Sequence, residues 1–246
     1  IYTLSLHDAL PIYQPIIAAV KNGTIVCTPF CEEHVAEASL DFTLGNYFYK
    51  QESDESYRIY NPFDAEDVAR YFKGPLEAMT HKEWCDRFGY MYLKNIPLDQ
   101  PIIILKPGER ILAHTHEFVG IRAEGGSAQV LSRSTWGRNG VAVCFDAGWI
   151  DPGYINRITL EIYNLNMHES VVLPVGERIG QLVFHKTGPV AGGYGSGERG
   201  VSDKYQVGDD LDEIMRSWHP EMMLPKAYKD QRRMPEVISG LSEGVK

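Results

Sequence analysis

The sequence contains few cysteines, no long apolar run and a deficit of positive charge. Only 4 cysteines occur among 246 residues, too few and too scattered for a disulfide framework, so we expect reduced thiols in a cytoplasmic protein. No apolar run reaches the roughly 18 residues that a membrane-spanning helix needs. The formal net charge of −9 argues against polymeric nucleic acid or an anionic membrane as a partner, because both need a basic surface. A few arginines still suffice to bind a small phosphorylated ligand.

The sequence also lacks a complete set of metal ligands. His114 and His116 follow Gly108 with the spacing that opens a cupin metal motif, and side chains at i and i+2 of a strand point the same way. The glutamate that this motif requires is missing, since Gly120 and Ile121 occupy its positions, so we interpret both histidines as ordinary strand residues. The zinc-dependent nucleobase deaminases need H-x-E together with P-C-x-x-C, and no P-C-x-x-C occurs in this sequence, which excludes that class. We therefore expect no zinc.

Hydrophobic patterning predicts a mainly β chain with short helices. Residues 1–12 resemble translated sequencing adapter and are expected to be non-native. Residues 14–22 are expected to form a helix that ends at Gly23. From 101 to 184, short apolar runs alternate with Gly, Pro, Asp and Asn turns at a spacing of about ten residues, which is typical of a β-barrel or jelly roll.

The stretch from about 50 to 98 is charged and aromatic, and we interpret it as a helical insertion into the β domain. Asp64 can cap one helix, and Thr80 with Glu83 forms a capping box before a second. The expected organisation is an adapter-derived segment at 1–12, a domain at 13–206 that includes the insertion, and a C-terminal helix and tail at 207–246.

The C-terminal helix is predicted from its cap and its apolar stripe. Asp209 or Asp210 can cap a helix that Pro220 ends. The apolar residues at helical spacing are Leu211, Ile214, Met215 and Trp218. The polar remainder is expected to be a loose tail.

Two polar segments lie in turns between the apolar runs. RSTWGR at 133–138 places two arginines and a serine around a turn, and guanidinium groups suit phosphate oxygens. AGWIDPGY at 147–154 contains a tight Asp-Pro-Gly turn that would bring Asp151 and Tyr154 to one pocket rim. Taken singly, a solvated loop and a plain hairpin explain these segments equally well.

A third segment, ITLEIYN, places a carboxylate inside an apolar strand. Leu160 and Ile162 face one side of this strand, and Glu161 faces the other with Thr159 and Tyr163. A carboxylate in such a strand is costly unless it is paired or functional. An exposed glutamate on an edge strand is the alternative.

Together, RSTWGR, AGWIDPGY, ITLEIYN, IGQLVF, YGSG and KYQ, in this order and spacing, resemble the dCTP deaminases of the dUTPase superfamily. ASLDFTLGNYFY at 38–49 is similar to the first conserved strand of that family, and the resemblance covers roughly residues 14–206. It implies a dUTPase-like distorted β-barrel or jelly roll and hydrolytic deamination of dCTP to dUTP and ammonia. It further implies a homotrimer with active sites between subunits, and Mg²⁺ bound through the nucleotide triphosphate and not in a protein cage.

The resemblance also implies roles for individual residues. Glu161 matches the glutamate that activates water for attack on cytosine C4, and Ser134 and Arg138 match the pair that supports it. Asp151 matches the aspartate that binds the deoxyribose, with Tyr154 against the sugar. Further positions expected to bind the nucleotide are Arg133, Thr135, Trp136, Gly137, Thr159, Leu160, Gln181, Tyr194, Lys204 and, more weakly, Gln206.

Two neighbouring residues bear on the product. Members of the family that also cleave the triphosphate to dUMP and pyrophosphate resemble this chain at 147–149, where Gly148 is expected to leave space for a second water beside the α-phosphate. Asp146 replaces the usual threonine and would oppose a triphosphate, but it is expected to face away. The combination favours dUMP as the product.

Two alternatives stay open at this point. A dUTPase on the same fold would lack a glutamate at the position of Glu161 and would need no second arginine at Arg138. A non-catalytic nucleotide-binding trimer would keep Asp151 and lose the catalytic groups; the unusual Asp146 keeps this alternative open.

Overall fold

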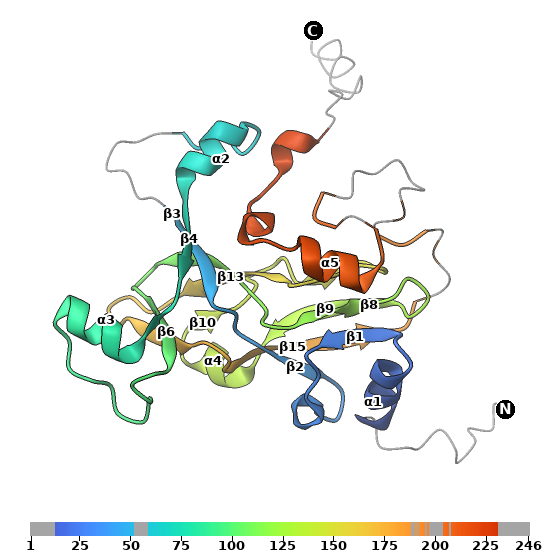
Figure 1. Ribbon diagram of the computed structural model, residues 1–246, viewed down its shortest axis with the longest axis horizontal. Helices are drawn as coiled ribbons and strands as arrows, with labels where there is room; N and C mark the ends of the chain where they lie inside the picture. The colour runs from blue at the N-terminus through green and yellow to red at the C-terminus, as the bar shows by residue number, and fades with distance from the viewer. Residues whose placement is uncertain are drawn as a thin grey trace, which may run out of the picture.

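The part of the chain that the computed structural model describes contains four β-sheets, each of which contributes buried residues to the main apolar core. Figure 1 shows the order of the strands and helices along the chain. The described residues are 13–51, 59–187, 190, 192–194, 196, 204–206 and 208–230. The prediction of a mainly β fold with short helices is confirmed. The segment 1–12, expected to be non-native, lies outside the described residues. None of the helices in the described ranges combines the length and the apolar character needed to cross a bilayer.

All strand pairs are antiparallel within the described residues. The five-stranded sheet runs in the order β10 (Val141–Ala142), β13 (Thr159–Asn164), β7 (Arg110–His114), β3 (Tyr47–Gln51) and β4 (Phe72–Glu77). The four-stranded sheet consists of β11 (Trp149–Ile150), β9 (Ser127–Ser132), β15 (Arg178–His185) and β2 (Leu40–Thr43). The two three-stranded sheets are β1 (Ile25–Thr28), β8 (Phe118–Ile121) and β12 (Ile155–Asn156), and β14 (Val171–Pro174), β6 (Pro101–Leu105) and β5 (Met79–Thr80).

The five-stranded sheet has one face in the core and one face outside it. Leu160 and Ile162 of β13 are fully buried in the main core, as their alternation with polar residues predicts. Glu161 lies between them and is paired with Leu112 of β7, which is in turn paired with Tyr49 of β3. Residues paired across neighbouring strands share a face, so these three side chains lie on the outer face of the sheet.

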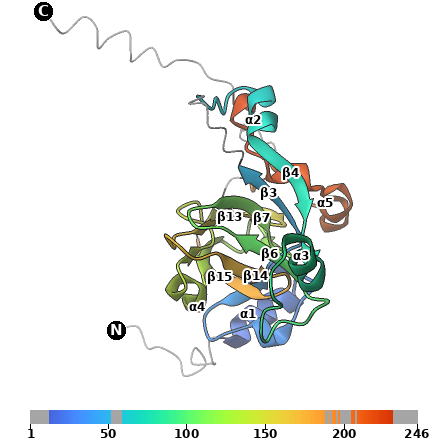
Figure 2. The same cartoon turned by 90° about the vertical axis from the view of Figure 1, so that its left-hand side faces the viewer.

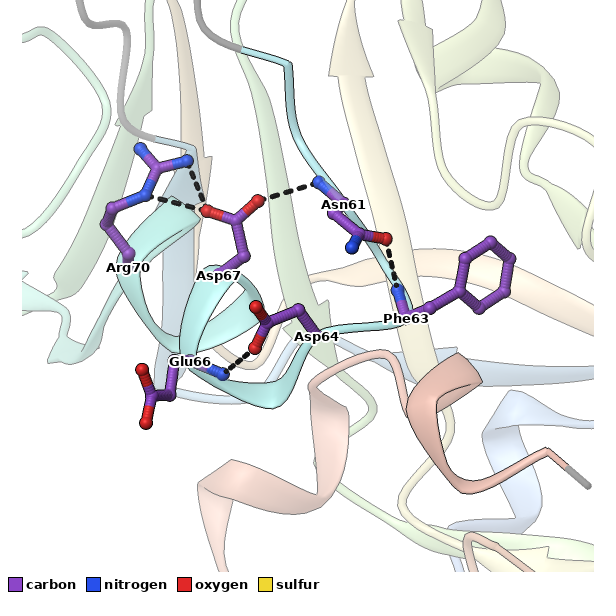
Figure 3. Close-up of polar contacts among 6 residues, drawn as sticks. All are labelled: Asn61, Phe63, Asp64, Glu66, Asp67 and Arg70. Carbon is purple, nitrogen blue, oxygen red and sulfur yellow. Dashed lines mark hydrogen bonds and ion pairs between the residues drawn. The ribbon is translucent and has the colours of Figure 1, made fainter.

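The region predicted to be a helical insertion contains both expected helices, α2 (Ala65–Tyr71) and α3 (His81–Phe88). The Asp64 side chain accepts from the Glu66 amide at 2.9 Å, and Asp67 links the Asn61 amide to Arg70 (Figure 3). The capping box of Thr80 and Glu83 is present before α3. The sequence did not predict β4 and β5, which pair with β3 and β6 and so join this region to the sheets.

The C-terminal helix is also confirmed, with Asp210 as its cap: the Asp210 carboxylate accepts from the Glu213 amide at 2.8 Å. Helix α5 (Leu211–Ser217) buries Ile214 in a small cluster against β8 and β12. The remaining helical segments are α1 (Tyr13–Lys21), η2 (Glu32–His34), α4 (Ser134–Arg138), η3 (Pro220–Met223) and η4 (Ala227–Lys229).

The expectation of a loose tail after Pro220 is wrong for residues 220–230. Met223 is 3% exposed and packs in a cluster with Phe72 and Leu112. Figure 2 shows β3, β4 and α2 extending from the body of the molecule, with the C-terminal segment beside them. Residues 220–230 pack against the fold because the apolar Met223 side chain contacts an apolar site formed by distant residues, and residues 231–246 lie outside the described residues.

Candidate active site

A pocket of about 520 Å³ lies on the outer face of the five-stranded sheet. Strands β13 and β7 contribute to its lining together with the turn after β11 and part of the C-terminal segment. This volume suits a small-molecule ligand. The charged and aromatic polar side chains that line it are Arg110, Asp151, Tyr154, Glu161, Tyr194 and Tyr205, and Thr159 lies beside them.

Glu161 is the buried carboxylate of this pocket. Its side chain points away from the core because Leu160 and Ile162, its neighbours on β13, occupy the core positions. Its Oε2 atom is buried and has no hydrogen-bond partner among the described residues. A buried acceptor without a partner is costly to the fold, so it is a candidate for contact with a ligand or water.

Burial raises the pKa of Glu161 from its ordinary value of 4.5 to about 7. The positive charge of Arg110 acts in the opposite direction and favours the carboxylate. A carboxylate whose pKa lies near neutral pH can both take a proton from water and give it up again. The site is therefore suited to general acid/base chemistry.

The Asp-Pro-Gly turn forms the rim of the pocket. Asp151 is exposed there, its carbonyl accepts from the Tyr154 amide at 3.1 Å, and both side chains line the pocket as predicted. Tyr194 joins them, since its amide donates to the Pro152 carbonyl at 2.8 Å. The rings of Tyr154 and Tyr194 meet edge to face with centroids 5.0 Å apart.

Gly153 allows this close approach. It has φ +91°, and a Cβ atom there would lie 2.8 Å from the Tyr194 amide nitrogen. Both the backbone conformation and the contact therefore require glycine.

The Gln206 side chain stabilises the same turn through hydrogen bonds to backbone groups. Its Oε1 accepts from the Ile155 amide at 2.7 Å, and its Nε2 donates to the Gly153 carbonyl at 3.0 Å and to the Gly208 carbonyl at 2.9 Å. The side chain is 3% exposed, so its amide is committed to the backbone of the turn. Lys204 forms an ion pair with Asp230 and lies outside the pocket lining.

The segment 133–138, here called the arginine loop, lies away from this pocket. Arg133 Nε is 3.1 Å from Asp41 Oδ2, and Arg178 Nη1 approaches the same oxygen at 3.4 Å. Gln181 is paired with Asp41 across β15 and β2, and the Trp136 indole donates to the Arg178 carbonyl at 2.9 Å. These contacts form a cationic cluster around the buried Asp41 carboxylate, next to α4.

One chain thus brings together only part of the predicted site. Asp151, Tyr154, Thr159, Glu161 and Tyr194 line one pocket. Leu160 is fully buried and presents only its backbone to that side of the sheet. The predicted positions whose side chains do not line this pocket are Arg133, Ser134, Thr135, Trp136, Gly137, Arg138, Gln181, Lys204 and Gln206.

Several lining residues were not predicted from the sequence. Arg110 and Leu112 could have been found by pairing β7 with β13, because alternation puts both on the face of Glu161. Phe72, Met223 and Pro225 had no such signal, since they reach the pocket from segments far away in the sequence.

The physical reason expected for Gly148 is wrong. Its side-chain position is not open space: a Cβ atom there would lie 2.5 Å from the Val130 carbonyl oxygen. Glycine is needed because β9 passes this close, with the Val130 amide donating to the Gly148 carbonyl at 2.7 Å. Asp146 is exposed and does not line the pocket, which agrees with its expected outward orientation.

His114 and His116 do not face one another. His114 is fully buried; its Nδ1 lies 2.7 Å from the Thr115 carbonyl oxygen, and its Nε2 accepts from the Tyr47 amide at 3.2 Å. Burial lowers the pKa of His114 to about 4, so the ring is neutral with its proton on Nδ1. His116 is exposed. The two side chains therefore have different environments.

Comparison with known proteins identifies related sequences. A family model described as dCTP deaminase-like matches residues 13–187. A protein of Methanopyrus kandleri named "dCTP deaminase, dUMP-forming" is 33% identical over 178 residues, which cover 70% of this chain and 79% of that protein. A protein of the same name from Methanobrevibacter smithii is 34% identical over 182 residues, covering 73% of this chain and 82% of that protein.

Among solved structures, the 2'-deoxycytidine 5'-triphosphate deaminase of Agrobacterium tumefaciens superposes with a TM-score of 0.48 at 18% identity. The superposition covers 70% of this chain and 47% of that one.

Proposed function

Because this chain belongs to the dCTP deaminase-like family, we propose that it catalyses the hydrolytic deamination of dCTP. The observation that carries the proposal is Glu161, a buried carboxylate with an unpartnered oxygen and a pKa of about 7 in a pocket of nucleotide size. Relatives that share about a third of their residues with this chain carry the same activity in their names.

In the proposed reaction, Glu161 takes a proton from a water molecule, and the resulting hydroxide attacks C4 of the cytosine ring. Glu161 returns that proton to the ring nitrogen N3 and then transfers the hydroxyl proton of the tetrahedral intermediate to the amine. The bond between C4 and the exocyclic amine breaks, C4 becomes a carbonyl carbon, and ammonia departs. Such general acid/base assistance contributes roughly 10²–10⁴-fold to the rate. The rim formed by Asp151, Tyr154 and Tyr194 is proposed to hold the deoxyribose, so that C4 lies over the carboxylate.

We extend the proposal to the product. The names of the relatives from Methanopyrus kandleri and Methanobrevibacter smithii specify dUMP formation, which supports cleavage of the triphosphate to dUMP and pyrophosphate by this chain as well. Gly148 does not supply the space for the second water, so that water would have to be held elsewhere in the pocket.

The complete site is proposed to form between subunits of a homotrimer. Glu161 and the cationic cluster around Asp41 occupy different places on one chain, and the Glu161 pocket contains one arginine, Arg110, among its lining residues. A triphosphate needs more positive charge than that. Ser134 and Arg138 are exposed on α4 and are available to a neighbouring copy.

Mg²⁺ is proposed to enter with the triphosphate. The described residues contain no group of three or more His, Cys, Asp and Glu side chains that could hold a metal ion. A zinc ion held by the protein needs such a group of side chains, whereas a cation carried by phosphate oxygens does not.

We also propose a cytoplasmic location, which the four free cysteine thiols support.

The test is a product assay. Folded protein is incubated with dCTP and Mg²⁺, and ammonia, dUTP, dUMP and pyrophosphate are quantified. Release of ammonia together with an equal amount of pyrophosphate supports both parts of the proposal. Ammonia with accumulating dUTP rejects only dUMP formation, and no ammonia from dCTP, dCDP or dCMP rejects the deaminase itself.

A further inference from the structure

Two segments that lie outside the main core meet on the outer face of the five-stranded sheet. The region predicted to be an insertion contributes α2 and β4, and the C-terminal segment contributes η3. They form a second apolar cluster, here called the outer cluster, whose buried members are Tyr49, Val68, Phe72, Leu112 and Met223. Two parts of the chain about 150 residues apart are therefore joined through apolar side chains.

The outer cluster is also a wall of the Glu161 pocket. Phe72, Leu112 and Met223 belong to the cluster and line the pocket, and Pro225 continues the same surface. Leu112 is directly opposite Glu161 in the register of β7 and β13. The apolar wall therefore begins next to the carboxylate.

The two ends of the pocket differ in chemistry. The rim at Asp151 and Tyr154 offers polar groups, whereas the outer-cluster residues that line the pocket, Phe72, Leu112 and Met223, are apolar and cannot stabilise phosphate charge. A nucleotide whose sugar lies at the rim and whose C4 lies at Glu161 must therefore direct an edge of its base toward the outer cluster. C5 is bonded to C4, so a group carried on C5 lies on the pocket wall closest to Glu161.

We propose that the outer cluster makes this pocket selective for a deoxycytidine nucleotide with an apolar substituent at C5, and that Phe72 and Met223 determine that selectivity. The inference rests on the proposed function and deepens it. Burying one methyl group against such a wall is worth about fourfold in affinity or rate. A hydroxyl group in the same place would lose its water without gaining a partner from the apolar wall.

The experiment compares three substrates on the full-length protein: dCTP, 5-methyl-dCTP and 5-hydroxymethyl-dCTP. The expected order of kcat/KM is 5-methyl-dCTP first, by about fourfold over dCTP, with 5-hydroxymethyl-dCTP below the methyl compound. A kcat/KM for 5-methyl-dCTP equal to or below that of dCTP overturns the proposal, as does a preference for the hydroxymethyl compound.

Substitutions at Met223 then test whether this residue produces the preference for 5-methyl-dCTP over dCTP. Met223→Ala should reduce the ratio of the two kcat/KM values to about one, because the methyl group loses its wall. Met223→Leu nearly conserves volume and should keep the ratio, and it serves if the alanine variant does not fold. Met222→Ala is the matched control, since Met222 is the adjacent methionine and does not line the pocket. An unchanged ratio in folded Met223→Ala rejects the assignment.

Failure of the proposed function would be recognised separately. Binding of dCTP and 5-methyl-dCTP to Glu161→Gln is measured by calorimetry, which requires no turnover. If no substrate is deaminated but the methyl compound still binds more tightly, the selectivity stands and the reaction is wrong. If turnover occurs and neither binding nor kcat/KM favours the methyl compound, the reaction stands and the selectivity is wrong.

Discussion

The Asp41 carboxylate lies 3.1 Å from the Nε atom of Arg133, although the two residues are 92 positions apart in the sequence. Asp41 is 5% exposed, and burial raises its pKa while Arg133 and Arg178 counteract the shift. Strand β2 is thereby tied to the start of the arginine loop. The ion pair fixes the direction in which one proposed phosphate-binding side chain points.

Asp41→Asn should therefore weaken nucleotide binding. Loss of the charge frees the Arg133 guanidinium to adopt other orientations, and we expect the KM for dCTP to rise roughly tenfold to a hundredfold with a smaller change in kcat. Steady-state kinetics on dCTP checks this. Glu177→Gln, at an exposed carboxylate next to Arg178, is the control, and an unchanged KM in the Asp41 variant would contradict the positioning role.

Glu161→Gln should abolish turnover while nucleotide binding persists. Glutamine keeps the shape of the side chain but cannot take a proton from water, so the rate of ammonia release should fall at least ~10²-fold. Calorimetry with dCTP checks that the pocket is intact, and Glu124→Gln, at an exposed loop position, serves as the control. A variant that retains more than about a tenth of the wild-type rate rules out Glu161 as the general base.

The pH dependence follows from the raised pKa of Glu161. The base must be ionised to accept a proton, so kcat/KM should increase with pH through an acid limb near 7, the pKa of the folded carboxyl group. A limb near the ordinary value of 4.5 would show that the carboxyl group is not buried during catalysis.

The same pKa shift affects stability with a defined sign. Between 4.5 and about 7 the folded protein holds a proton on Glu161 that the unfolded chain has released, so rising pH lowers the free energy of unfolding in this window. Glu161→Gln does not titrate. Its melting temperature relative to wild type should therefore increase between about pH 5 and about pH 8, as measured by calorimetric scans.

Gly153→Ala should damage the rim. The substitution introduces strain at φ +91° and places Cβ 2.8 Å from the Tyr194 amide nitrogen, so Tyr194 should separate from the turn. We expect weaker dCTP binding and a lower melting temperature. Gly176→Ala is the control, because Gly176 has a similar φ of +79° and a Cβ atom there would meet no atom within 4 Å. A larger loss of stability and of binding in Gly153→Ala would then come from the contact with Tyr194. Equal losses in the two variants would show that backbone strain alone is responsible.

Metal removal should separate Mg²⁺ from zinc. EDTA is expected to stop the reaction, and excess Mg²⁺ should restore it, because the cation accompanies the triphosphate. Metal analysis of the purified protein should find substoichiometric zinc. Recovery with zinc but not with Mg²⁺ would reject this assignment.

Local sequence signals predicted much of the fold. The alternation of Leu160, Glu161 and Ile162 placed the carboxylate outside the core, and the caps at Asp64, Thr80 and Asp210 were all found in the structure. Each of these signals depends on residues a few positions apart, where periodicity and hydrogen-bonding geometry are strongly constrained.

Long-range contacts could not be predicted in the same way. Nothing near Met223 indicates that it packs against Phe72 and Leu112, because the pairing depends on how distant strands are ordered. The role of Gly148 was misjudged for a related reason, since the Val130 carbonyl that fills the space belongs to another strand. The sequence motif identified Gly148, but only the fold shows which atoms surround it.

Gln206 and Met223, which stabilise the turn and the wall of the pocket, are synthesised after Glu161 and the Asp151 turn. Translation proceeds from the N-terminus, so Glu161 and the Asp151 turn leave the ribosome before the residues that hold the turn and close the wall. A nascent chain that ends before residue 206 would have the proposed catalytic carboxylate, Glu161, without the residues that hold the turn and complete the pocket wall. We therefore expect deaminase activity only in chains whose synthesis has passed residue 223.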